Sequence, residues 1–154
     1  MHKDLVSDDV SMAKQFVGMW RLVSCAHRLA DGTIRHDPKS MAYFIYTDTN
    51  HVCYVAMSPS RSAWKSATAP TADEMAAGLG NHAFYAYCAT AELHAKRGFV
   101  LLHLEIDKSP NMVGATRKRW FTFEGANRVV LRVDPQENTL PVVESTLTWE
   151  RVDD

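Results

Sequence analysis

The sequence has few cysteines, and those it has are widely spaced. Cys25, Cys53 and Cys88 are an odd number, and no two of them form a CxxC motif. A disulfide framework or a cysteine-rich zinc site uses more cysteines at closer spacing. We therefore expect buried thiols, a reducing compartment and a cytoplasmic protein.

Long hydrophobic runs and long basic runs are absent too. No segment approaches the roughly 18 apolar residues of a membrane span, and the N-terminal stretch MHKDLVSDDVSMAKQF lacks the apolar core of a signal peptide. The formal net charge is −1, and the longest basic run is Arg117-Lys118-Arg119. We expect neither a membrane nor a nucleic acid among the partners.

Short motifs that carry well-known chemistries are missing as well. The chain has no GxGxxG, P-loop or GxSxG motif, and its seven histidines show neither HxH nor HExxH spacing. His103 and Glu105 could supply two metal ligands from one strand, but no third ligand is identifiable. We expect no metal and no cofactor.

What is present is the composition of one folded domain. The chain has 154 residues, of which 46% are hydrophobic and 23% charged. That length suffices to bury about two-thirds of the unfolded surface in one core. Residues 1–12 are polar and charged, so we expect a flexible arm there and a single domain over 13–154.

Most of that domain reads as short β-strands. Alternating or aromatic-rich runs bounded by turn residues follow Gly18 and cover 41–47, 51–57, 85–93, 99–106, 115–123, 127–133 and 143–152. In the first run, strict alternation puts Trp20, Leu22, Ser24 and Ala26 on one face and Arg21, Val23, Cys25 and His27 on the other. About eight serial antiparallel strands predict an all-β, up-and-down barrel, because closure removes the free sheet edges.

One helix interrupts the strands. Thr71 and Glu74 have the spacing of a capping box, which predicts a short helix near 71–80. With the loop over 58–70, this helix would gate the barrel mouth. An eight-stranded barrel is just wide enough for packed side chains or one small ligand.

Four motifs resemble the lipocalin-like domain family of small bacterial and fungal barrels. They are FVGMWRLVS at 16–24, YFIYT at 43–47, HLE at 103–105 with PNMVG at 110–114 and Arg119 beyond, and LTWERV at 147–152. The resemblance implies a lipocalin-like barrel whose closed end is plugged by Trp20 near the last strand. Leu102 and Met112 depart from the usual pattern, where a second His and a Trp are common.

The closed end has a second expected member. Arg151 lies in the last strand, beside the expected position of Trp20. A guanidinium over an indole ring both stacks and donates hydrogen bonds, so we expect this pair to stabilise the fold.

The strands over 99–106 and 115–123 hold the candidate catalytic groups. His103 and Glu105 are two residues apart and share a face, and Arg119 lies on the neighbouring strand. We expect His103 as acid/base, Glu105 as partner base and Arg119 as the cation that holds Glu105 ionised and stabilises an oxyanion.

Burial of the apolar residues gives the opposite orientation. Val100, Leu102, Leu104 and Ile106 form a continuous apolar face, which would turn inward and send His103 and Glu105 to solvent. On the next strand the same argument puts Phe121, Phe123 and Arg119 inside. The two orientations remain alternatives at this point.

Two functions follow from these alternatives. The first is binding of a small hydrophobic or aromatic molecule, with Tyr46, Tyr54, Tyr87, Asn111, Arg117 and Phe121 as the expected ligand-binding residues. The second is a cofactor-independent isomerase, cyclase or lyase that acts on a small natural-product-like or aromatic substrate by general acid/base catalysis. Such enzymes, ligand carriers and proteins without assigned activity all occur among proteins that this chain resembles. A homodimer is an open alternative to a monomer.

Overall fold

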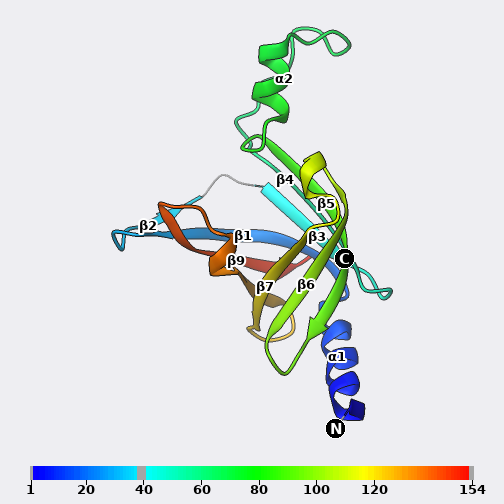
Figure 1. The fold of residues 1–154 in the computed structure, drawn as a ribbon. Coiled ribbons are helices and arrows are strands. Elements are labelled where there is room, and N and C mark those ends of the chain that lie inside the picture. The colour runs from blue at the N-terminus through cyan, green and yellow to red at the C-terminus, as the bar shows by residue number, and fades with distance from the viewer. Residues whose placement is uncertain (1, 38–40, 153–154) are drawn as a thin grey trace.

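A computed structural model describes residues 2–37 and 41–152, with the backbone alone for 2–7 (Figure 1). In chain order the elements are α1 (His2–Phe16), β1 (Gly18–Leu29), β2 (Ile34–His36), β3 (Met41–Tyr46), β4 (His51–Met57), α2 (Ala72–Leu79), β5 (Phe84–His94), β6 (Phe99–Asp107), the 3₁₀ turn η1 (Pro110–Met112), β7 (Thr116–Phe123), β8 (Arg128–Val133), the 3₁₀ turn η2 (Pro135–Glu137) and β9 (Val142–Arg151). Within the described ranges, neither helix has the length and apolar character of a membrane span.

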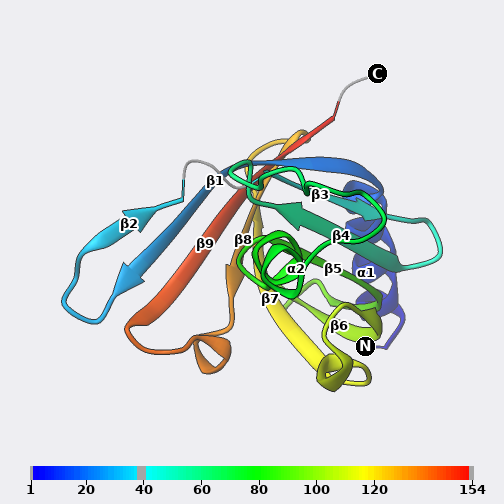
Figure 2. The same ribbon diagram turned by 90° about the horizontal axis from the view of Figure 1, so that it is seen from above.

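The strands form one closed antiparallel barrel. The order is β2-β1-β3-β4-β5-β6-β7-β8-β9, and β1 also pairs with β9, which closes the ring (Figure 2). The N-terminal part of β1, Gly18–Arg21, pairs with β3, whereas Ala26–Arg28 pairs with the short β2. The barrel therefore has eight strands with β2 as one extra strand, which confirms the predicted fold class.

The predicted short helix is present as α2. Thr71 caps it, since its hydroxyl accepts from the Glu74 amide while the Glu74 carboxylate accepts from the Thr71 amide. Trp64 from the preceding loop packs on the helix, and its Nε1 donates to the Glu74 carbonyl at 3.0 Å. A Cβ at Gly78 would lie only 2.9 Å from that nitrogen, so the glycine makes room for the indole. In Figure 1, α2 stands at the end of the barrel opposite α1.

Trp20 and Arg151 plug the barrel near α1, as predicted. The Trp20 side chain is fully buried, and its Nε1 donates to the Phe16 carbonyl at 2.8 Å. The Arg151 guanidinium carbon lies 4.3 Å from the Trp20 ring centre. Its nitrogens donate to the carbonyls of Gln15 and Val17 at 2.6 Å each. One side chain of the last strand thus ties together α1 and β1.

The N-terminal segment contains a helix that the sequence did not predict. We expected a flexible arm over 1–12; α1 runs from His2 to Phe16, Met1 lies outside the described residues, and the division into an arm and one domain over 13–154 stays a prediction. Phe16 is buried against Tyr46, with ring centres 5.3 Å apart. Asp9 Oδ1 accepts a hydrogen bond from the Ala95 amide at 2.8 Å. These contacts come from β3 and the β5–β6 turn, so local polarity could not reveal them.

The cysteine prediction is wrong for two of the three residues. Cys53 and Cys88 lie directly opposite each other on β4 and β5 and form a disulfide on the outer face of the barrel. Cys25 is a free, buried thiol. Because the pair is 35 residues apart in sequence, only the strand register brings it together. The prediction of a cytoplasmic protein therefore loses its main argument, and it stays a prediction, as does the homodimer.

Replacement of Trp20 by alanine tests the plug. We expect the free energy of unfolding to fall by about 3–5 kcal/mol, because a fully buried indole leaves a large cavity. The matched control is Met19→Ala. Met19 is the residue before Trp20, and its side chain faces outward and is 38% exposed. The control should change stability by about 0.5 kcal/mol. Equal urea unfolding midpoints for both variants would contradict the assignment.

Candidate functional site

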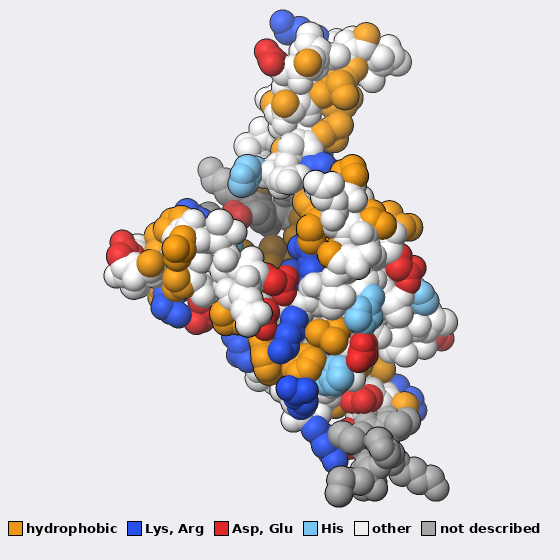
Figure 3. All heavy atoms as spheres, viewed as in Figure 1, with side chains coloured by type: hydrophobic (Ala, Val, Ile, Leu, Met, Phe, Trp, Pro, Cys, Tyr) orange, Lys and Arg blue, Asp and Glu red, His pale blue; other side chains and the backbone are white. Residues whose placement is uncertain are grey.

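The barrel encloses a cavity of about 370 Å³. This volume falls at the lower end of the roughly 300–1,000 Å³ that small-molecule sites occupy. Figure 3 shows the hollow below α2, with hydrophobic and basic side chains inside it. The lining comes from most of the barrel strands and is mainly apolar.

Aromatic side chains form one wall of the cavity. Tyr54 and Tyr87 stack with ring centres 5.0 Å apart and an interplanar angle of 26°. Trp149 meets Tyr54 edge-on at 6.2 Å and Phe44 at 4.8 Å. Burial raises the pKa of Tyr54 to about 12. The pKa of Tyr87 is likewise raised by burial. These phenols are therefore neutral, and they offer flat rings and hydrogen-bonding hydroxyls rather than bases.

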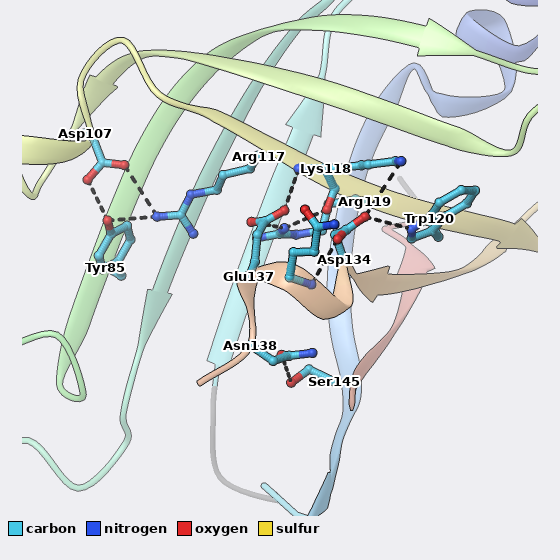
Figure 4. A network of polar contacts seen from close by, with 11 residues as sticks. Tyr85, Asp107, Arg117, Lys118, Arg119, Trp120, Asp134, Glu137, Asn138 and Ser145 are labelled. Atoms are coloured by element: carbon cyan, nitrogen blue, oxygen red, sulfur yellow. Dashed lines mark hydrogen bonds and ion pairs between the residues drawn. The ribbon is translucent and has the colours of Figure 1, made fainter. Parts of the chain in front are cut away.

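Arg117, Tyr85 and Asp107 form a polar cluster at the edge of this wall (Figure 4). The Tyr85 hydroxyl accepts from Arg117 Nη2 at 3.0 Å and donates to Asp107 Oδ1 at 2.6 Å. The Asp107 side chain is fully buried, and its Oδ2 lies 3.8 Å from Arg117 Nη2. Arg117 Nε is buried and has no hydrogen-bond partner among the described residues. The cluster therefore fixes a cation in the cavity wall and leaves one N–H group unpaired.

Arg119 lies next to this cluster and is held by a different carboxylate. Its side chain lines the cavity and is 13% exposed. Arg119 Nη1 donates to Glu137 Oε1 at 2.9 Å, and Glu137 Oε2 accepts from the Lys118 amide at 2.8 Å. Glu137 comes from η2, the turn between β8 and β9. The expected partner, Glu105, is not close in register, since Arg119 stands opposite Val100.

His27 brings an imidazole to the same cavity through a directed chain of hydrogen bonds. Its Nδ1 lies 2.8 Å from Ser145 Oγ, and Ser145 Oγ donates to Asn138 Oδ1 at 3.2 Å. Asn138 Nδ2 in turn donates to the Val143 carbonyl at 3.2 Å. Since that carbonyl can only accept, Asn138 presents its oxygen to Ser145, and Ser145 must accept from His27 Nδ1–H. The chain therefore leaves the lone pair on His27 Nε2.

The surroundings of His27 keep the imidazole neutral. Burial lowers its pKa below the ordinary 6.5, and the Arg35 charge lowers it further, while the Asp37 charge acts in the opposite direction. Cys25 Sγ lies 3.5 Å from His27 Nε2. Burial and Asp37 raise the pKa of the Cys25 thiol to about 11, so the sulfur stays protonated. A protonated thiol is a weak donor and a poor nucleophile.

A β-bulge in β1 is the reason that His27 faces inward. Leu22 pairs with Trp149 and Ser24 pairs with Thr148, so Val23 is an extra residue in the ladder. The alternation changes phase at this residue. Cys25 and His27 therefore join Trp20 and Leu22 inside, where strict alternation predicted Ser24 and Ala26.

A second bulge, in β6, places Asp107. Leu104 pairs with Ala89 and Ile106 pairs with Cys88, which makes Glu105 the extra residue. Beyond the bulge, Asp107 stands opposite the inward-facing Tyr87, and Ile106 is 66% exposed. Each bulge thus turns one ionisable side chain toward the barrel interior. Strand alternation gives no signal for either bulge, so the sequence analysis missed the inward direction of His27 and Asp107.

The expected catalytic pair lies outside the barrel. Val100, Leu102 and Leu104 face inward and are at most 5% exposed, so His103 and Glu105 face outward. His103 contacts Glu92 and Thr116 at 2.7 and 3.0 Å, and Glu105 accepts a hydrogen bond from Thr90. The expectation that His103 and Glu105 line the cavity is therefore wrong. Burial of three aliphatic side chains decides the strand orientation, and both polar groups find partners on the surface.

The expected ligand-binding residues divide into two groups. Those that line the cavity are Tyr46, Tyr54, Tyr87 and Arg117, together with Arg119. Phe121 is buried against Phe16 instead, with ring centres 5.1 Å apart, and Asn111 is exposed in η1. On β7, Arg117 and Arg119 share the inward face with Phe121, as expected from burial of the aromatic side chains on that strand. A role in binding stays a prediction for each of these residues.

The lowered pKa of His27 predicts a pH-dependent stability. On unfolding, the pKa returns to about 6.5, so below that pH the unfolded chain binds a proton that the folded protein takes up only at lower pH. Stability is therefore full above pH 6.5 and is lost as pH falls toward the folded pKa. Relative to His27→Asn, the wild type should lose free energy of unfolding on acidification. A difference that stays constant with pH would show that burial does not disfavour the charged imidazole.

Known proteins similar to this chain are found among solved structures and through one family model. Among solved structures, a de novo designed fluorescence-activating β-barrel has a TM-score of 0.47 at 10% identity, covering 91% of this chain and 96% of that chain. A redesigned β-barrel has a TM-score of 0.43 at 10% identity, covering 92% of this chain and 95% of that one. A search of curated proteins found no match. The family model of the lipocalin-like domain matches residues 17–152, which span the whole barrel from β1 to β9. The chain belongs to the lipocalin-like domain family.

Proposed function

We propose that the barrel cavity binds a small, flat, hydrophobic molecule with an aromatic ring and at least one oxygen acceptor. The observation that carries this proposal is the aromatic wall beside an incompletely paired arginine. Tyr54 and Tyr87 stack on each other, and the Arg117 guanidinium carbon lies 5.1 Å from the Tyr87 ring centre. A flat ring packs on such a wall, and edge-to-face contact with Trp149 adds to the fit.

A fixed cation in the cavity wall defines the polar part of the ligand. Arg117 is held by Tyr85 and Asp107, and its side chain lines the cavity and is 20% exposed. A hydrogen bond to a charged group contributes about 1.5–3 kcal/mol. Carbonyl, phenol and ether oxygens can accept from this guanidinium. The cavity is thus complementary to an oxygenated aromatic molecule rather than to a plain hydrocarbon.

The alternative function, cofactor-independent acid/base catalysis, needs different residues from those expected. His103 and Glu105 lie on the outer surface and cannot reach a molecule in the cavity. An isomerase, cyclase or lyase in this barrel would have to use groups that line the cavity. His27 lines the cavity and is such a group.

A pair of adjacent substitutions tests binding. Ala56 lines the cavity, whereas Val55 faces outward and is 44% exposed. Ala56→Trp fills the cavity with an indole, and Val55→Trp puts the same group on the surface. 7-Diethylamino-4-methylcoumarin, a neutral flat dye with a lactone carbonyl that fluoresces more strongly in apolar surroundings than in water, is titrated into each protein.

The wild type and Val55→Trp should bind the dye with micromolar dissociation constants, and Ala56→Trp should weaken binding at least tenfold. Thermal melting of all three proteins shows whether the barrel is intact. Equal binding by Ala56→Trp and Val55→Trp would place the dye outside the cavity. No binding by the folded wild type would refute the proposed function.

A further inference from the structure

The cavity contains a base as well as a binding wall. We propose that His27 Nε2 removes a proton from the carbon next to a ring carbonyl of the bound molecule, so that the protein isomerises an enolisable cyclic ketone. The inference rests on the proposed function, since the ketone occupies the same cavity. It adds the reaction class and names the base.

The directed chain behind His27 supports this role. The Val143 carbonyl orients Asn138, Asn138 orients Ser145, and Ser145 accepts from His27 Nδ1. Ser145 is only 6% exposed, so water does not readily replace it in this chain. A histidine whose Nδ1–H is fixed in this way presents its Nε2 lone pair in one direction. That is the arrangement in which an orienting group prepares an imidazole as a general base.

The groups that face His27 agree with a neutral base. On its own strand, Cys25 presents a protonated thiol to Nε2 at 3.5 Å. From β2, Arg35 stands directly opposite His27, and its positive charge disfavours the imidazolium. Asp37, after β2, acts in the opposite direction but more weakly than burial and Arg35. From β9, Ser145 contributes a neutral hydroxyl. The base is therefore unprotonated at neutral pH.

The proposed step balances without an oxidant or a cofactor. The carbon–hydrogen bond breaks, the proton goes to His27 Nε2, and the electron pair moves onto the carbonyl oxygen to form an enolate. Arg117 lies in the same cavity wall, where Tyr85 and Asp107 hold it, and its positive charge stabilises the negative charge that develops on this oxygen. When the ketone carries a β,γ double bond, the enolate is a dienolate, and return of the proton from His27 to its γ-carbon moves the double bond into conjugation with the carbonyl and regenerates the neutral imidazole.

Cys25 is the competing candidate for chemistry in this part of the cavity. A cysteine nucleophile has to be a thiolate, and burial raises the pKa of Cys25 to about 11. The protonated thiol therefore leaves proton transfer with a substrate as the chemistry available to His27, rather than covalent attack by sulfur.

Hydrogen–deuterium exchange of β-tetralone tests the inference. This flat bicyclic ketone has acidic hydrogens next to its carbonyl, and proton NMR in deuterated water follows their loss. The proteins compared are the wild type, His27→Asn and the surface control His103→Asn. Asparagine can keep the hydrogen bond to Ser145 but has no basic nitrogen. Displacement of 7-diethylamino-4-methylcoumarin measures β-tetralone binding separately.

We expect the wild type and His103→Asn to accelerate exchange equally, and His27→Asn to lose at least tenfold of that acceleration while it binds β-tetralone with unchanged affinity. Because the His27 pKa is lowered from 6.5, the wild-type rate should hold to a lower pH than an ordinary imidazole would allow and then fall as Nε2 becomes protonated. Equal exchange by His27→Asn and the wild type would overturn the role of His27 and leave the binding function intact. Dye binding without β-tetralone binding would overturn the ketone as the ligand class, and failure of the dye to bind would overturn the proposed function itself.

Discussion

The pairing of β1 with β9 is the contact on which the rest of the structure depends. It closes the barrel, and Arg151 holds its end by stacking on Trp20 at 4.3 Å and donating to backbone carbonyls before β1. A Cβ at Gly18 would come within 2.6 Å of the same guanidinium, so this approach requires glycine there. The same β1–β9 pairing also sets His27 directly opposite Ser145. The closed end and the cavity's base are thus held by one pair of strands.

Two irregularities in otherwise regular strands give the cavity its polar groups. The extra residues Val23 and Glu105 shift the alternation of β1 and β6, and they turn His27 and Asp107 toward the interior. Bulges of this kind are frequent beside active sites because they re-aim side chains without altering the fold. The proposed binding and proton-transfer functions both depend on these two residues.

More of the fold than of the candidate site could be predicted from the sequence. Period-two patterns and the Thr71 capping box depend on neighbours in sequence, so they could be predicted. The Trp20–Arg151 pair was expected from the family resemblance. The inward direction of Arg117 and Arg119 also followed from burial of Phe121. A bulge leaves no signal in the composition of a strand. The sequence therefore could not show that His27, rather than His103, faces the cavity. The α1 helix and the Cys53–Cys88 pair depend on contacts between distant segments, which only the closed barrel brings together.

The central claim is that a fixed, neutral His27 faces a ligand cavity, and its tautomer tests that claim most directly. Nitrogen-15 NMR of the imidazole distinguishes a protonated ring nitrogen from one with a lone pair. The account predicts a neutral ring with the proton on Nδ1 at neutral pH, and protonation of Nε2 only below pH 6.5. A neutral ring with its proton on Nε2, or a charged ring at neutral pH, would contradict it.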